Sequence, residues 1–250
     1  MIRPLLPARL SIALSLILPA LLWATGAAAA EFTPAQRVEI VAIMRDALKQ
    51  DPSILRDAVM ALQADEGKRS QQATRAAIAQ TQNQLVTPAD PVAGDPQGDV
   101  TIVEFFDTRC PYCRGMEPVM DKFLTGDHRV RLVYKDLPIL GPASVLGTRA
   151  LLAAQQQGAY GKMREAVMKL PPDTTIAQIE RSARALGLDW PRMARDMDDP
   201  AVQARIEANL KLAHGLGIQG TPALVIGNDL VPGAVDLPQL QKAVAEARHG

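Results

Sequence analysis

The chain has 250 residues, of which 27 are basic and 27 acidic, so its formal net charge at pH 7 is zero. This balance argues against nucleic acid and against an anionic membrane surface as partners. The length is enough for one substantial hydrophobic core with an accessory segment, and cysteine occurs only twice.

The first 30 residues are predicted to be a secretory signal peptide. Arg3 and Arg9 form a positively charged region, residues 10–23 are apolar, and the Ala-Ala-Ala run at 28–30 offers an A-x-A cleavage site. The alternative is an uncleaved membrane anchor, which a proline and a glycine disfavour because they interrupt a span of marginal length. We expect a mature protein in the periplasm. Loss of Arg3 and Arg9 leaves it 25 basic residues against 27 acidic ones.

Residues 31–66 are predicted to form two short amphipathic helices. Residues 33–36 (Thr-Pro-Ala-Gln) supply an N-cap, a proline at the first helical position and a capping-box glutamine, and residues 51–52 (Asp-Pro) start a second helix in the same way. Large apolar side chains recur at helical spacing in both. Because two short helices cannot bury their apolar faces alone, they must pack on the main domain or on copies of themselves.

The next segment, residues 67–90, is expected to be a polar helical linker. Ile78 is the only large apolar side chain between residues 65 and 84, which are rich in glutamine, alanine, arginine and lysine. Such a composition gives a solvated helix or a mobile linker and no core. Three prolines in turn-forming contexts follow, so we place a domain boundary near residue 90.

Residues 91–250 are predicted to form the main domain, with an α/β fold. The order of its elements is β-α-β, a block of helices, then β-β-α, which is the order of a thioredoxin fold with a helical insertion. The expected elements are strands at 100–107, 129–135, 223–226 and 230–232, helices at 114–124 and 237–247, and a helical insertion at 141–215.

The two cysteines lie together at residues 110–113 (Cys-Pro-Tyr-Cys), between a predicted strand and a predicted helix. Two thiols at this spacing can close into a disulfide or attack the disulfide of another protein. A helix N-terminus favours the reactive thiolate through its unpaired N–H groups and its dipole. The alternatives are an inert disulfide or half a zinc site, but zinc needs four ligands and the three histidines show no ligand spacing. We therefore predict thiol redox chemistry, with no metal and no other cofactor.

The sequence resembles the DsbA-like thiol-disulfide oxidoreductases. The resemblance rests on residues 103–106 (Val-Glu-Phe-Phe), 110–113 (Cys-Pro-Tyr-Cys) and 220–223 (Gly-Thr-Pro-Ala). Within that family the chain is most similar to the suppressor-of-copper-sensitivity C (ScsC-like) proteins, because of its N-terminal helical segment with Asp-Pro-Ser-Ile-Leu at 51–55. The resemblance implies that residues 31–66 are an oligomerisation segment.

The resemblance also implies roles for individual residues. Cys110 is expected to be the nucleophile and Cys113 the thiol that resolves the mixed disulfide. Thr221 and Pro222 match the family's cis-proline loop, which lies beside the cysteines and binds an extended substrate. Glu104 matches an acid beneath the disulfide in relatives and is expected to take the proton from Cys113. The alternative for Glu104 is a strand carboxylate that points to solvent.

Pro111 and Tyr112, between the cysteines, are expected to tune the pair or to contact substrate. Relatives with histidine at the second of these positions gain a donor toward the thiolate, whereas this chain has tyrosine. The departure argues against a strongly oxidising protein. Equally open is a simpler role for Tyr112, as an aromatic side chain at the rim of the site.

The expected partners are exported proteins with thiols or disulfides, together with a membrane thiol reductase. The sequence favours a homo-oligomer that isomerises or reduces non-native disulfides. One alternative is a dithiol oxidase, reoxidised by a membrane oxidase, which introduces disulfides into exported proteins. A minor alternative is a copper-tolerance module that holds Cu(I) on the two cysteine thiolates, since Cu(I) prefers soft ligands.

Overall fold

The computed structural model describes residues 32–249 and divides the chain into two compact units, Met1–Met60 and Ala61–Gly250. The predicted signal peptide, residues 1–30, lies outside the described residues. No helix in the described range is both long and apolar enough to cross a membrane.

The first unit contains α1 (Pro34–Gln50), which begins at the predicted capping box. The Thr33 hydroxyl oxygen accepts a hydrogen bond from the Gln36 N–H at 3.2 Å, and the Gln36 side chain accepts one from the Thr33 N–H at 2.9 Å. None of the residues of α1 is buried within the described chain. Its exposed apolar side chains are Val38, Ile40, Val41, Ile43, Met44 and Leu48.

The second helix, α2 (Ser53–Gln80), is longer than the sequence predicted. The expected short helix and the separate polar linker form one helix of 28 residues, without a break at residue 66. The reason is composition, because the segment has no proline and only one glycine, Gly67, among many good helix formers.

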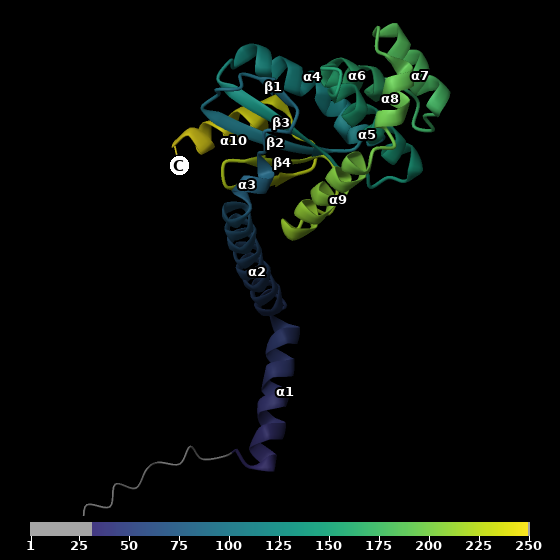
Figure 1. Ribbon diagram of the computed structural model, residues 1–250. Helices are drawn as coiled ribbons and strands as arrows, with labels where there is room; N and C mark the ends of the chain where they lie inside the picture. The colour runs from purple at the N-terminus through teal and green to yellow at the C-terminus, as the bar shows by residue number, and fades with distance from the viewer. Residues whose placement is uncertain (1–31, 250) are drawn as a thin grey trace, which may run out of the picture. The chain divides into compact units, whose positions relative to one another are not determined.

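The second unit is built on a five-stranded sheet with the order β1-β3-β2-β4-β5 (Figure 1). β2 and β3 are parallel and the other neighbours are antiparallel. The predicted strands are all present, and a three-residue edge strand, β1, was not predicted because it is too short to show a pattern. The strands are β1 (Val92–Gly94), β2 (Val100–Phe106), β3 (Val130–Asp136), β4 (Ala223–Ile226) and β5 (Asp229–Pro232).

The helices of this unit follow the predicted order, so the thioredoxin fold with a helical insertion is confirmed. The short α3 precedes the sheet, α4 connects β2 to β3, and α10 closes the chain. Helices α5 to α8 gather beside one end of the sheet in Figure 1. The helices are α3 (Gln82–Leu85), α4 (Pro111–Gly126), α5 (Pro142–Gln155), α6 (Tyr160–Met168), α7 (Ile176–Ala185), α8 (Trp190–Asp196), α9 (Pro200–Gly215) and α10 (Leu237–His249).

Alternate side chains of β2 enter two hydrophobic cores on opposite faces of the sheet. One core holds α4 and most of the helical insertion. The other contains Ile78 of α2 and Leu85 of α3, which are 0% and 1% exposed and cluster with Val103 and Phe105 of β2. The end of the expected polar linker is therefore part of the core, and Ile78, its one large apolar side chain, is the anchor.

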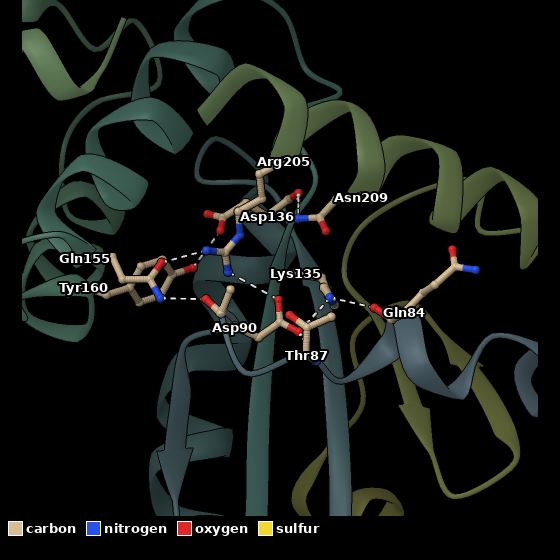
Figure 2. A network of polar contacts seen from close by, with 10 residues as sticks. Gln84, Thr87, Asp90, Lys135, Asp136, Gln155, Tyr160, Arg205 and Asn209 are labelled. Carbon is tan, nitrogen blue, oxygen red and sulfur yellow. Dashed lines mark hydrogen bonds and ion pairs between the residues drawn. The ribbon is translucent and has the colours of Figure 1, made fainter. Parts of the chain in front are cut away.

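A buried polar network lies at the expected domain boundary near residue 90 (Figure 2). Asp90 accepts hydrogen bonds from the Lys135 ammonium group at 2.8 Å and from Arg205 at 3.2 Å. The side chains of Asp90 and Lys135 are each only 3% exposed. Lys135 also donates to the Gln84 carbonyl oxygen at 2.8 Å. The network joins the segment before β1 to β3 and α9, so this boundary is not a loose connection.

Candidate functional site

The Cys-Pro-Tyr-Cys motif lies where the sequence predicted, between β2 and α4. Cys110 is the N-cap of α4 in an extended conformation, and Pro111 occupies the first helical position. No side chain caps this end of the helix, so its first N–H groups are available to a thiolate at Cys110. Pro111 and Tyr112 are exposed, and 68% of the Tyr112 surface is accessible.

The two cysteines differ in their surroundings. Cys110 is 4% exposed, Cys113 is fully buried, and their sulfurs are not bonded to each other. Burial is the main reason why the pKa of the Cys113 thiol is raised far above its usual value. Cys113 therefore needs a base if it is to react as a thiolate.

Thr221, which follows Cys110 by 111 residues in sequence, meets it in space. The Cys110 thiol donates a hydrogen bond of 3.1 Å to the Thr221 carbonyl oxygen. The Thr221–Pro222 peptide bond is cis, as the resemblance led us to expect. Thr221 is partly exposed, and Pro222, directly before β4, is buried. The backbone of Thr221 is therefore the part of this loop that lies next to the Cys110 sulfur.

Glu104 is buried beneath the motif, which excludes the solvent-facing alternative. Its side chain is 2% exposed and lies on the middle of β2, in register with Tyr134 of β3 and Leu224 of β4. Burial raises the pKa of Glu104 to about 7, while nearby Arg164 opposes the shift and Glu117 adds to it. The charge of Glu104 in turn contributes to the raised pKa of Cys113.

Arg164, from α6 of the helical insertion, is the charged partner that the sequence did not reveal. Its Nη2 atom lies 3.4 Å from Glu104 and 2.6 Å from Glu117, and its Nη1 atom donates to Glu117 at 2.8 Å. The guanidinium carbon also lies 4.6 Å and 4.1 Å from the ring centroids of Phe106 and Tyr134. Arg164 follows Cys113 by about 50 residues in an ordinary helical pattern, and no sequence signal marks it.

Asp107 anchors the loop between β2 and α4. Its carboxylate is fully buried and accepts hydrogen bonds from four donors on both sides of the site. The donors are the Arg109 N–H at 2.8 Å, the Ser144 hydroxyl at 2.7 Å, and the Ile139 and Leu140 N–H groups at 2.8 and 3.0 Å. One side chain thus ties the active-site loop to the loop after β3 and to α5.

Two arginines tie the same loop to the helical insertion. Arg109 donates to the carbonyl oxygens of Leu140 and Pro172. Arg114 donates to Thr108 at 2.9 and 2.7 Å and to Leu170 at 2.8 Å. The guanidinium groups therefore satisfy backbone carbonyls and hold the motif in place.

Two family descriptions match the chain. The DSBA-like thioredoxin domain matches residues 101–245, and the copper resistance protein ScsC N-terminal domain matches residues 36–69. The first match covers more than half of the chain and contains the motif, Glu104, Arg164 and the Thr221–Pro222 loop.

Solved structures agree with this assignment. The chain is 44% identical to a thioredoxin-like oxidoreductase from Silicibacter pomeroyi DSS-3, with a TM-score of 0.65 over 67% of this chain and 98% of that one. It is 31% identical to Proteus mirabilis ScsC in a transitional conformation, with a TM-score of 0.64 over 88% of this chain and 98% of that one.

Similar proteins of two kinds are found by sequence. The thiol:disulfide interchange protein DsbA of Bordetella parapertussis is 26% identical over 60% of this chain and 73% of that protein. The chain also matches Na⁺/H⁺ antiporters, of which that of Salinispora tropica is 30% identical, but it spans only 26% of the antiporter's length. With the fold and the site as described, the chain belongs to the DsbA-like thioredoxin-domain family.

Proposed function

We propose that the chain is a DsbA-like thiol-disulfide oxidoreductase that reduces or isomerises non-native disulfides of exported proteins in the periplasm. The observation that carries the proposal is the position of Cys110. Cys110 occupies the N-cap position of α4, and its thiol contacts the Thr221 carbonyl oxygen at 3.1 Å, while Cys113 is fully buried. The N-terminus of a helix favours negative charge, and the thiolate is the attacking species in thiol-disulfide exchange.

The exchange proceeds in two steps. The Cys110 thiolate attacks one sulfur of a client disulfide, the other client sulfur leaves as a thiolate and takes a proton, and a mixed disulfide results. Cys113 then gives its proton to Glu104 and attacks the Cys110 sulfur, which releases the second client thiol. The client gains two electrons and the chain ends with a Cys110–Cys113 disulfide. In isomerisation, a second client thiol attacks before Cys113 does, and the protein returns to its dithiol form.

Glu104 has the properties that the second step requires. Cys113 is fully buried and has a raised pKa, so it does not ionise unaided at neutral pH. Glu104 is buried on the same side of the sheet and has a pKa of about 7, close to the value at which a general base works best near neutral pH. The carboxyl group can therefore take up a proton in one step and lose it later.

Client binding is assigned to the surface around Cys110. Pro111 and Tyr112 are exposed beside the sulfur, and Thr221 offers backbone groups to an extended chain. Ile139 and Leu140, which Asp107 holds against the active-site loop, are each 42% exposed. These apolar side chains suit an unfolded client, which exposes apolar residues.

The isomerase assignment rests on the N-terminal segment. Residues 36–69 match the ScsC N-terminal domain. The large apolar side chains of α1 are exposed, and nothing in the described chain buries them. We assign residues 31–66 to a homo-oligomer that presents several Cys110 sites to one client, with a membrane thiol reductase keeping the dithiol form. A dithiol oxidase is the second candidate, since a DsbA interchange protein is among the relatives.

Two measurements decide between these activities. An isomerase recovers the activity of scrambled ribonuclease and carries mostly free thiols when trapped from cells, whereas an oxidase is trapped with its disulfide closed. Removal of residues 31–60 should give a monomer that keeps dithiol reductase activity and loses isomerase activity. The cut precedes Ile78 and Leu85, which belong to the second core. An unchanged oligomeric state after the cut would contradict the assignment.

A copper-tolerance role is the minor candidate, because the matched N-terminal family is described as a copper resistance protein domain. Two thiolates at this spacing can hold Cu(I). Copper tolerance retained by a Cys110→Ala, Cys113→Ala variant would remove every thiol-based explanation of that role. Absence of copper binding by the reduced protein would remove direct binding alone.

A further inference from the structure

Arg164 contacts two carboxyl groups, and it contacts them unequally. Its two terminal nitrogens face the two oxygens of Glu117 at 2.8 and 2.6 Å, in the forked geometry of a strong arginine–carboxylate pair. Glu104 has one longer contact, of 3.4 Å, to a nitrogen that Glu117 already engages. The cation is therefore divided between the two acids in favour of Glu117.

The guanidinium group is buried between aromatic rings, within reach of both acids. It is stacked on the rings of Phe106 and Tyr134, and the whole residue is 5% exposed. Arginine keeps its positive charge in proteins, so the charge of a buried guanidinium must be balanced by the nearest carboxylates. Here one cation lies beside two acids, and the acid that forms the closer ion pair with it is stabilised in the charged carboxylate form.

The groups that face Glu104 come from three elements. α6 supplies the cation, α4 supplies an acid and a thiol, and β3 supplies a phenol, while the neighbouring residue of β4 is a leucine. The titratable and charged groups coupled to Glu104 are Arg164, Glu117, Cys113 and Tyr134.

We propose that Glu117 is a positioning residue of the exchange reaction, which holds the guanidinium of Arg164 and so prevents that cation from forming a full ion pair with Glu104. The inference rests on the proposed role of Glu104 as the acceptor of the Cys113 proton. A full ion pair would stabilise the Glu104 carboxylate and make it a weaker base. Glu117 can bear this charge more easily than Glu104 can, because its side chain is 21% exposed.

The test is the pH dependence of the second step alone. The reduced protein reacts with 5,5′-dithiobis(2-nitrobenzoate), so that attack by Cys110 releases one coloured thiolate and attack by Cys113 releases the second. The rate of the second release is measured against pH. For the natural chain, we expect this rate to rise with pH. The rising limb of the rate–pH curve should have its midpoint near the pKa of Glu104.

Substitutions of Glu117 and of Arg164 should shift the midpoint of this limb in opposite directions. In Glu117→Gln, which keeps the shape and removes the charge, Arg164 turns to Glu104 and the midpoint falls by about 1 pH unit. In Arg164→Met, Glu104 loses its cation and the midpoint rises by about 1 pH unit. Glu117→Asp keeps the charge and should remain near the natural chain. If Arg164→Met does not fold, the comparison of the two Glu117 variants decides.

The matched control is Asp121→Asn, one turn further along α4. Asp121 is exposed, and among the described residues no ion pair joins its side chain to Arg164. The variant removes the same charge, so it reports a non-specific electrostatic effect, which we expect to be below about 0.3 pH unit. Equal shifts in Glu117→Gln and Asp121→Asn, or no shift in either, would overturn the proposal.

The variant Glu104→Gln tests the proposed role of Glu104 as proton acceptor separately from the positioning role of Glu117. Loss of the limb in Glu104→Gln shows that Glu104 is the acceptor, and the Glu117 variants then test the positioning role by themselves. A limb that persists unchanged in Glu104→Gln overturns the role of Glu104 and the positioning role with it.

Discussion

The thiol of Cys110 donates a hydrogen bond of 3.1 Å to the carbonyl oxygen of Thr221. A thiol can donate this bond and a thiolate cannot, so the contact belongs to the protonated state. In the exchange proposed above, the attacking Cys110 thiolate no longer makes this bond, so the Thr221 carbonyl is free to accept a hydrogen bond from the backbone of a client. The proposed mechanism therefore links attack by Cys110 to the binding of a client at Thr221.

The different surroundings of the two cysteines predict different trapping behaviour. Cys113→Ser should accumulate mixed disulfides with clients, because Cys110 attacks and nothing resolves the product. Cys110→Ser should accumulate very few, since Cys113 is fully buried and its pKa is raised. Non-reducing electrophoresis after acid quenching measures both. Equal trapping by the two variants would contradict the assignment of Cys110 as the nucleophile.

Glu104 should make the protein less stable at alkaline pH. Its folded-state pKa is about 7 against a usual value of 4.5, so folding disfavours the charged form, and the penalty grows as pH rises from about 4.5 to 7. The full penalty is on the order of 3 kcal/mol. Glu104→Gln should therefore be more stable than the natural chain at pH 8 and similar to it at pH 4.

Urea unfolding at the two pH values measures this difference. Asp136 is also buried and has a pKa raised to about 6, mainly by burial, so the natural chain has a second contribution of the same sign. The comparison of Glu104→Gln with the natural chain at each pH removes that contribution. A constant difference between the two proteins across this range would contradict the buried, protonated Glu104.

Two glycines offer a matched test of how closely α5 approaches the active-site loop. A Cβ atom on Gly147 of α5 would lie 2.5 Å from the Thr108 hydroxyl oxygen, whereas one on Gly161 of α6 would meet nothing within 4 Å. Gly147→Ala should destabilise the fold by about 1–3 kcal/mol and slow the attack by Cys110. Gly161→Ala should stabilise it by about 0.5–1 kcal/mol. Thermal unfolding and single-turnover thiol exchange check both.

The buried pair of Asp90 and Lys135 should be costly to break from one side. Asp90→Asn leaves the ammonium group buried without its counter-charge, and we expect a loss of about 3–5 kcal/mol. A second substitution, Lys135→Met, should recover part of that loss by removing the stranded charge. Asp65→Asn, which breaks the exposed pair with Arg69, is the control and should change stability by less than about 1 kcal/mol. Similar losses in the two aspartate variants would contradict a buried network.

The sequence predicted the parts of the fold that depend on local patterns. The strand before Cys110, the capping box at Thr33 and the helical insertion follow from hydrophobic runs, caps and turn residues, and the structure contains all of them. The sequence did not predict that the second helix and the polar helical linker are continuous, and α2 runs without a break from Ser53 to Gln80.

Only part of the candidate site could be predicted from the sequence. Cys110 and Cys113 are separated by only two residues in sequence, and Thr221 could be placed beside them through the resemblance. Arg164 meets Glu104 only because the fold brings its side chain against those of β2 and β3, and contacts of this kind between distant residues leave no periodic trace in one sequence.

The two families that the chain matches end at residue 69 and begin at residue 101, and the 31 residues between them belong to neither match. Yet Ile78, Leu85 and Asp90 from this interval fill one core and anchor the buried network. The residues between the two matched families are therefore more than a spacer, because they belong to the core of the thioredoxin-like domain. A transplant of the N-terminal segment onto another thioredoxin-like domain would have to carry this interval with it, together with a sheet face shaped to receive it.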